Sequence, residues 1–132
     1  MIPSKKENYK CVVIDDDQMS IDILGNYIKN IAELSLFKTY TNPASAITEI
    51  KLEDEIDFLF LDISMDISGL DVARVLRNKV QFLVFVTSYD EYALDAFGVN
   101  GDKFLVKPIS FQKLQTAVSE VLNRENRRAG LI

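Results

Sequence analysis

The chain of 132 residues contains no histidine and a single cysteine, Cys11. The lack of histidine excludes every mechanism that needs an imidazole as base, nucleophile or metal ligand. A lone cysteine cannot form an internal disulfide, which fits a reducing compartment. Any chemistry must therefore come from carboxylates, hydroxyls, lysines or backbone groups.

Long apolar runs are also missing. Although 48% of the residues are hydrophobic, no run approaches the roughly 18 residues that a membrane span needs. The first ten residues, MIPSKKENYK, are polar and include no hydrophobic stretch of signal-peptide length. We therefore expect a cytoplasmic protein that makes no membrane contact.

The net charge and the length further limit the possible functions and the number of domains. The formal net charge is -5, which disfavours direct nucleic-acid binding because that usually requires a basic face. The length suffices for one domain with a hydrophobic core and is too short for two ordinary domains.

Short apolar segments alternate with segments of helical periodicity. Strands are expected at 10–14, 34–39, 57–61, 81–86 and 103–106. Helices are expected over 18–31, from Pro43 to about 52, after Ser68, over 91–97 and after Ser110. Such alternation predicts an α/β fold with five parallel strands and five helices on both faces of the sheet.

Helix starts are marked by residues that favour the N-cap. These are Asn42 followed by Pro43, Ser68 with Asp71 as a capping box, Asp90, and Ser110.

Polar residues follow four of the expected strands. They are Asp15, Asp16 and Asp17 after the first strand, Asp62 after the third, Thr87 and Ser88 after the fourth, and Lys107 and Pro108 after the fifth. In an open α/β sheet the functional crevice lies at the carboxyl ends of the strands. We therefore expect these groups to converge at one edge.

Carboxylates gathered at one edge repel each other. Two charges ~4 Å apart cost about 4 kcal/mol at an effective dielectric near 20. A hard divalent cation offsets this repulsion, and Mg²⁺ binds one or two carboxylates together with waters and phosphate oxygens. Lys107 adds a positive charge suited to a phosphate oxygen, and Thr87 adds a hydroxyl donor. The set predicts a phosphoryl site beside Mg²⁺, with a carboxylate as nucleophile.

Each residue of the set also has a structural interpretation when it is taken alone. Asp17 is best explained as a helix N-cap. Thr87 or Lys107 alone is more often structural, and a Lys-Pro pair can simply end a strand. The hypothesis of a phosphoryl site depends on their joint placement.

The motifs VVIDDD, FLFLDI, FVTS and FLVKPI, in this order, resemble those of a response-regulator receiver domain. The resemblance covers roughly residues 9–123. It implies a flavodoxin-like three-layer sandwich with a five-stranded parallel sheet in the order 2-1-3-4-5 and five helices.

The resemblance also implies roles for the acidic residues. Asp62 would accept a phosphoryl group from the phosphohistidine of a sensor histidine kinase. Asp16 would bind Mg²⁺ directly with Asp15 assisting, and Asp62 and the backbone carbonyl of Ser64 would complete the protein ligands.

Further roles follow from the same resemblance. Thr87 and Lys107 would contact the phosphoryl group, and Phe104 would be the aromatic residue that changes rotamer on activation. The Lys107–Pro108 bond is expected to be cis. The implied protein is a regulatory phosphoacceptor, not an enzyme in the ordinary sense, which promotes its own phosphotransfer and slow dephosphorylation.

The segments TSYDEYALDAF and FLVKPISFQKL resemble receivers that precede a LytTR-type DNA-binding domain. This implies transcription regulation through an output domain absent from the chain, with a homodimer on phosphorylation as one readout. Residues 1–123 would form the receiver domain. The basic segment 124–132, which breaks at Gly130, would begin a C-terminal linker or tail.

The sequence departs from the family pattern in three places. Asp66 stands where the family usually has a proline, and Gly69 follows Asp62 by seven residues instead of eight. Lys103 replaces an acid, and Phe104 replaces the common tyrosine. The loop after Asp62 is therefore one residue short, which bears on the aim of the Ser64 carbonyl.

Three alternatives remain open. A phosphohydrolase of the haloacid dehalogenase type also uses an aspartyl nucleophile, but needs an acid where this chain has Ser64. A flavodoxin-like FMN binder needs a Ser/Thr/Gly-rich loop after the first strand, where three acids stand. A degenerate receiver would act only as a protein-interaction module, and the shortened loop keeps this interpretation open.

Overall fold

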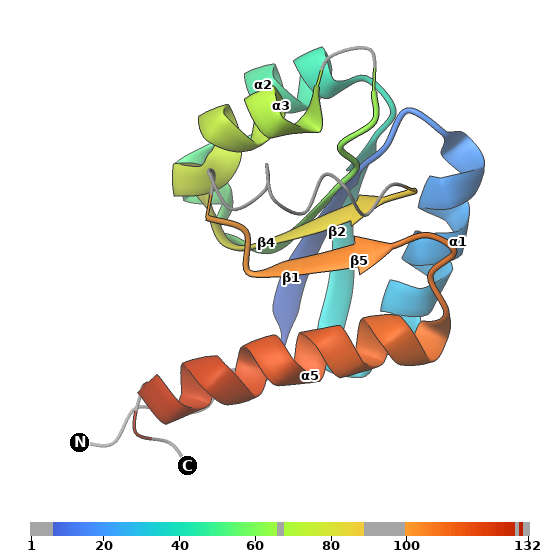
Figure 1. Cartoon of the computed structure of the whole chain (residues 1–132). Coiled ribbons are helices and arrows are strands. Elements are labelled where there is room, and N and C mark those ends of the chain that lie inside the picture. The colour runs from blue at the N-terminus through green and yellow to red at the C-terminus, as the bar shows by residue number, and fades with distance from the viewer. Residues whose placement is uncertain (1–6, 66–67, 89–99, 129, 131–132) are drawn as a thin grey trace.

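A computed structural model describes residues 7–65, 68–88, 100–128 and 130. Its strands are β1 (Tyr9–Ile14), β2 (Leu34–Tyr40), β3 (Ile56–Leu61), β4 (Val80–Thr87) and β5 (Lys103–Val106). All neighbouring strands run parallel, in the order β2-β1-β3-β4-β5 (Figure 1). The expected sheet order is confirmed.

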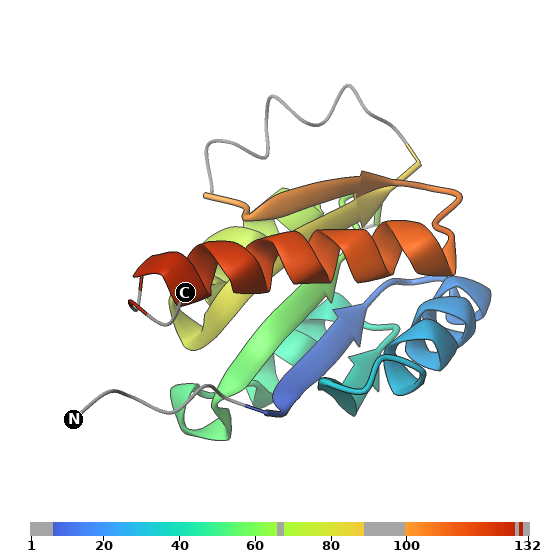
Figure 2. The ribbon, with the colours of Figure 1, turned by 90° about the horizontal axis from the view of Figure 1, so that it is seen from below.

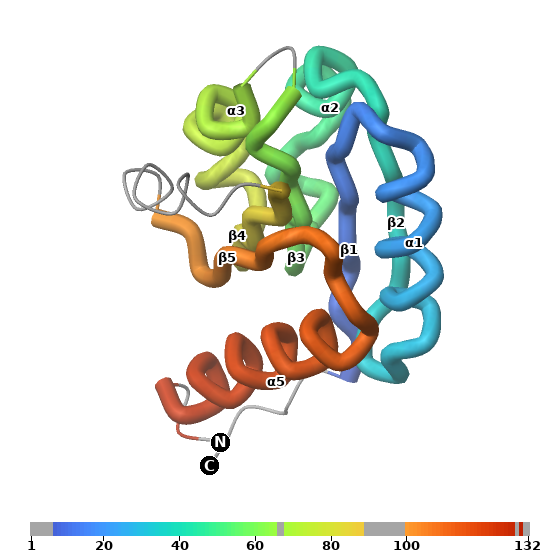
Figure 3. The backbone as a smooth tube through the Cα atoms, turned by 45° about the vertical axis from the view of Figure 1, so that its right-hand side comes forward, coloured from blue at the N-terminus to red at the C-terminus, as the bar shows by residue number. Residues whose placement is uncertain are grey.

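Helices cover both faces of the sheet. In the part of the chain that the structure describes they are α1 (Gln18–Lys29), α2 (Pro43–Glu49), α3 (Gly69–Leu76) and α5 (Phe111–Arg128). Helices α2 and α3 lie on one side of the sheet, and α1 and α5 on the other (Figure 3). The helix expected over 91–97, with its cap Asp90, lies outside the described residues.

The pleat of the strands divides the core into two layers. In β3, Phe58 and Phe60 face the cluster that α1 and α5 complete, whereas Leu59 and Leu61 face the cluster under α2 and α3. All six residues of β3 are buried, as expected for a strand covered on both faces. Such a strand delivers the residue that follows it to the edge of the sheet.

Four predicted N-caps are confirmed. The side chains accept backbone hydrogen bonds as follows: Asp17 from Met19 at 3.2 Å, Asn42 from Ala44 at 2.9 Å, Ser68 from Leu70 at 3.2 Å, and Ser110 from Lys113 at 3.1 Å. The carboxylate of Asp71, the second member of the expected capping box, instead accepts a hydrogen bond from Arg74 at 2.6 Å.

Helices α1 and α2 end before their expected limits, α1 at Lys29 instead of residue 31, and α5 extends into the segment expected to be a linker or tail. Helix α2 ends at Glu49, before the expected residue 52, and a 3-10 turn at Leu52–Asp54 follows it. Helix α5 continues to Arg128 and lies across the strands (Figure 2). The first five residues of the segment 124–132 are thus helical. None of the described helices is long and apolar enough to cross a membrane.

Candidate functional site

The carboxyl ends of β1 and β3 bring three carboxylates together. Asp15 directly follows β1 and Asp62 directly follows β3, and the Asp62 N–H donates to the Ile14 carbonyl at 3.0 Å. Asp15 and Asp62 are 4% and 5% exposed, while Asp16 is exposed. One carboxylate oxygen from each of the three lies within 4.8 Å of the others. They therefore form one cluster that is large enough for a cation.

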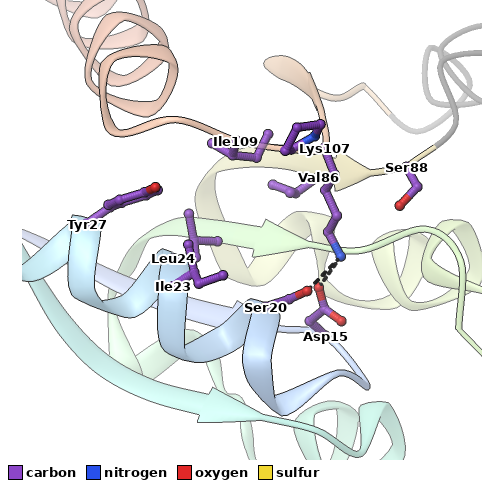
Figure 4. Close-up of a pocket in the computed structure, with 10 residues that line it drawn as sticks. Asp15, Ser20, Ile23, Leu24, Tyr27, Val86, Ser88, Lys107 and Ile109 are labelled. Carbon is purple, nitrogen blue, oxygen red and sulfur yellow. Dashed lines mark hydrogen bonds and ion pairs between the residues drawn. The ribbon is translucent and has the colours of Figure 1, made fainter.

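Lys107 reaches the same cluster from the end of β5. Its backbone N–H donates to the Thr87 carbonyl at 2.7 Å, which fixes the start of the side chain beside β4. Its Nζ donates to Asp15 Oδ2 at 2.7 Å (Figure 4) and lies 3.8 Å from Asp62 Oδ2. The ammonium therefore forms ion pairs with two of the three carboxylates.

The cluster holds more negative than positive charge. The pKa of Asp62 is raised to about 6, first by burial and then by the neighbouring Asp15 carboxylate. The Ser64 N–H donates to Asp62 Oδ1 at 3.1 Å. This hydrogen bond and the Lys107 ammonium both lower the pKa of Asp62, but it stays above the ordinary value of 3.8. The arrangement is the one expected of a cation site, because hard divalent cations prefer carboxylate and carbonyl oxygens.

The loop after Asp62 closes back onto the backbone of Asp62 itself. The Gly69 N–H donates to the Ile63 carbonyl at 3.0 Å. A Cβ on Gly69 would overlap the Asp62 carbonyl oxygen and lie 2.7 Å from the Ile63 Cα. Position 69 therefore requires glycine, because the backbone of Asp62 and Ile63 leaves no room for a Cβ. Asp66, which stands at the family's usual proline position, lies outside the described residues.

Ser64 lies in the first part of the same loop. The Ser64 Oγ is buried and has no hydrogen-bond partner among the residues that the structure describes. The structure holds the backbone of Ser64 close to Asp62 through the N–H that donates to Oδ1.

Thr87 is the last residue of β4, and Phe104 lies in the neighbouring strand β5. Thr87 is fully buried, and within the described ranges its Oγ1 has no hydrogen-bond partner. Phe104 is partly buried and packs against the cluster under α2 and α3. The Lys107–Pro108 peptide bond is cis.

Ser20 belongs to this site although the sequence did not single it out. The Lys107 Nζ donates to Ser20 Oγ at 3.2 Å (Figure 4), and the Ser20 hydroxyl donates to Asp17 Oδ2 at 3.0 Å. The available signal was position, because Ser20 follows the N-cap Asp17 by three residues and so lies in the first turn of α1.

A cavity of about 480 Å³ extends from these polar groups along α1. Its apolar lining includes Ile23, Leu24 and Tyr27 from α1, and Ile109 from the segment after β5 (Figure 4). The carboxylate site is thus open on the side where α1 faces the start of α5.

Comparison with known proteins agrees with this geometry. Residues 11–119 match the family described as Response regulator receiver domain. The chain therefore belongs to the response-regulator receiver domains, the regulatory modules of two-component systems.

Curated relatives include the sensory transduction protein LytT of Enterococcus faecalis, 33% identical in an alignment of 117 residues that covers 86% of this chain and 48% of that protein. The sensory transduction protein LytR of Staphylococcus saprophyticus is 29% identical over 85% of this chain and 45% of its own length. The chain thus spans about half the length of these relatives.

Among solved structures, the receiver domain of AraT, a response regulator from Geobacillus stearothermophilus, is similar with a TM-score of 0.78 and 26% identity. The match covers 91% of this chain and 97% of the other.

Proposed function

We propose that the chain is a phosphorylation-dependent signalling switch in which Asp62 accepts a phosphoryl group from the phosphohistidine of a sensor histidine kinase. The observation that carries this proposal is the placement of the buried Asp62 carboxylate beside Asp15 and Asp16, 3.8 Å from the Lys107 ammonium. A carboxylate oxygen forms the new bond to phosphorus as the phosphorus–nitrogen bond of the donor breaks.

Lys107 and Thr87 are the proposed partners of the transferred group. The Lys107 ammonium supplies positive charge to the phosphoryl oxygens, and the buried Thr87 hydroxyl supplies a donor. The new group brings nearly two negative charges and three acceptor oxygens to the site. Phe104 is proposed to repack as Thr87 moves toward these oxygens, which changes the surface around β5 and α5.

The carboxylate cluster fits Mg²⁺ as the cation of this site. The donor set consists of hard oxygens, and its negative charge is only partly compensated, as the raised pKa of Asp62 shows. Asp15, Asp16 and Asp62 would hold the ion together with the backbone carbonyl of Ser64. When bound, Mg²⁺ neutralises charge on the carboxylates and on the phosphoryl oxygens.

The output is proposed to lie in a further domain. Both curated relatives named above are about twice as long as this chain, and their names, LytT and LytR, suggest a LytTR-type DNA-binding output. The proposed location is the cytoplasm. Residues 1–123 would then form the receiver, with 124–132 leading onward and phosphorylation promoting a homodimer. The net charge of -5 supports a receiver that does not itself bind nucleic acid.

Treatment with acetyl phosphate and Mg²⁺ tests the proposal. We expect the wild-type chain to gain the mass of one phosphoryl group, and to bind beryllofluoride with Mg²⁺, as measured by ¹⁹F NMR. Asp62→Asn should do neither, whereas Asp22→Asn, which removes an exposed carboxylate of α1, should behave as wild type. Equal phosphoryl uptake by Asp62→Asn and wild type would refute the assignment.

A further inference from the structure

The Lys107 ammonium has a third partner besides its two carboxylates. Its Nζ donates to Ser20 Oγ at 3.2 Å as well as to Asp15 Oδ2 at 2.7 Å. Asp62 Oδ2 lies 3.8 Å away, which is too long for a hydrogen bond but short enough for an ion pair. An ammonium has three N–H donors, so two are used and the third is left for another acceptor.

The Ser20 hydroxyl is itself oriented by the start of α1. Its O–H donates to Asp17 Oδ2 at 3.0 Å, and the other oxygen of the same carboxylate accepts from the Met19 N–H and so caps the helix. Because the hydroxyl proton points at Asp17, the lone pairs of Ser20 Oγ are left for Lys107. The helix cap thereby fixes the direction of the Ser20–Lys107 hydrogen bond.

We infer that Ser20 is a positioning residue that holds the Lys107 ammonium in place for the phosphoryl group on Asp62. This inference rests on the proposed phosphorylation of Asp62. A phosphoryl oxygen extends beyond the Asp62 carboxylate oxygen to which the phosphorus is bonded. It can therefore lie closer to the Lys107 Nζ than that carboxylate oxygen does, and accept the third N–H. Ser20 and Asp15 can therefore keep their hydrogen bonds while the third donor contacts the phosphoryl group.

Ser20 matters most when a cation is present. Asp15 belongs to the carboxylate cluster. A cation bound to the cluster would partly neutralise Asp15 and so weaken its ion pair with Lys107. Ser20 is neutral and lies outside that cluster, so its hydrogen bond to Lys107 does not compete with the cation. Its oxygen then becomes the partner that keeps the ammonium beside Asp62.

Beryllofluoride binding with Mg²⁺, measured by ¹⁹F NMR, tests this role. The net contribution typical of a hydrogen bond in a protein changes an equilibrium constant about fivefold to tenfold. We expect Ser20→Ala to weaken beryllofluoride binding by about that factor, and Ser20→Thr, which keeps the hydroxyl, to restore it. Ser119→Ala removes a hydroxyl from an exposed position of α5 and should bind as wild type.

A double-mutant cycle in urea tests the contact without cation or phosphoryl analogue. Ser20→Ala should raise the unfolding equilibrium constant about fivefold more in the wild-type background than in a Lys107→Met background, where only the hydrogen bond from Ser20 to Asp17 remains to be lost.

Equal effects in the two backgrounds would show that Ser20 acts without Lys107 and would overturn the inference. Tight beryllofluoride binding by Ser20→Ala, or weak binding by Ser20→Thr, would also overturn it. If the wild-type chain itself fails to bind beryllofluoride, the proposed function fails, and with it the role of Ser20 in that function. The urea cycle separates these cases, because it detects the Ser20–Lys107 contact independently of phosphorylation.

Discussion

At the scale of single residues, the charged form of Asp62 is in an unfavourable environment. The fold buries its carboxylate beside Asp15 and compensates it only in part through Lys107 at 3.8 Å. These surroundings disfavour the ionised carboxylate and raise the pKa of Asp62 to about 6. The proposed uptake of a cation and a phosphoryl group requires such a charge, even though the charge destabilises the fold in their absence.

Asp62→Asn should therefore stabilise the chain when Mg²⁺ is absent. The folded state binds the Asp62 proton more tightly than the unfolded state, because the pKa rises from 3.8 to about 6. Wild-type stability consequently falls as the pH rises from about 4 through 6, and the asparagine variant lacks this loss. We expect a gain of up to about 3 kcal/mol in the free energy of unfolding at pH 7, measured by urea denaturation.

The pH profile provides the control for this variant. The gain should shrink toward zero below about pH 4, where Asp62 is protonated in both the folded and the unfolded state. Asp22→Asn, at an exposed position of α1, should change stability little at any pH. A gain that stays constant between pH 4 and 7 would contradict a charge effect at Asp62.

At the scale of elements, helix starts were more predictable than helix ends. Caps such as Asp17 and Ser68 act within a few residues, so the sequence alone reveals them. The end of α2 depends on distant packing, because Ile50 leaves the helix to lie buried in the cluster under α2 and α3. Helix α5 continues past 123 because its sequence contains no glycine or proline before Gly130.

Contacts between elements were not predictable from local patterns. Asp102, just before β5, accepts from Arg77 at 3.2 Å, from Arg124 at 3.0 Å and from the Leu83 N–H at 2.8 Å. It thereby joins the segment after α3 to β4 and α5. These partners lie 19 to 25 residues away along the chain, and no periodicity relates them.

Gly69→Ala is expected to disrupt the connection between β3 and α3. The new Cβ would overlap the carbonyl oxygen of Asp62 and press on the Ile63 Cα, and neither backbone atom can rotate away. We expect a loss of at least about 2 kcal/mol in the free energy of unfolding, together with weaker beryllofluoride binding because the backbone of Asp62 must shift. Urea denaturation and ¹⁹F NMR measure the two effects.

Gly25→Ala is the matched control for this variant. Gly25 is also buried in a helix, but a Cβ there would meet only the flexible end of the Leu36 side chain, at 3.2 Å. Alanine also gains about 1 kcal/mol in helix propensity over glycine. If Gly25→Ala costs as much stability as Gly69→Ala, the close approach to Asp62 is not the cause.

At the scale of the whole molecule, the candidate site follows from the topology. Because β1, β3, β4 and β5 are parallel neighbours, the residues after them meet at one edge. This rule, applied to the sequence, predicted that Asp15, Asp62, Thr87 and Lys107 would converge. It could not predict Ser20, since that contact depends on the rotation of α1 about its axis and on the side-chain conformation of Lys107.

Cation binding to this edge should stabilise the molecule as a whole. A cation that binds the folded state alone adds a free energy of RT ln(1 + [L]/Kd), about 2.7 kcal/mol at one hundred times the Kd. We expect the wild-type Tm to rise with the logarithm of the Mg²⁺ concentration once it exceeds the Kd, as followed by circular dichroism. Asp62→Asn, with less negative charge to compensate, should gain less, so that its advantage over wild type narrows as Mg²⁺ is added.

Ionic screening is the competing explanation for such a rise, because any salt weakens the repulsion between carboxylates. NaCl at matched ionic strength separates the two effects, since Na⁺ screens charge without requiring the ligand geometry that Mg²⁺ demands. Asp16→Asn tests the same point from the protein side, because Asp16 is exposed and its replacement should cost little folding energy. If the cluster binds Mg²⁺, this variant loses most of the Mg²⁺-dependent rise and keeps the response to NaCl. Equal responses to the two salts would instead mean that the three carboxylates are only screened.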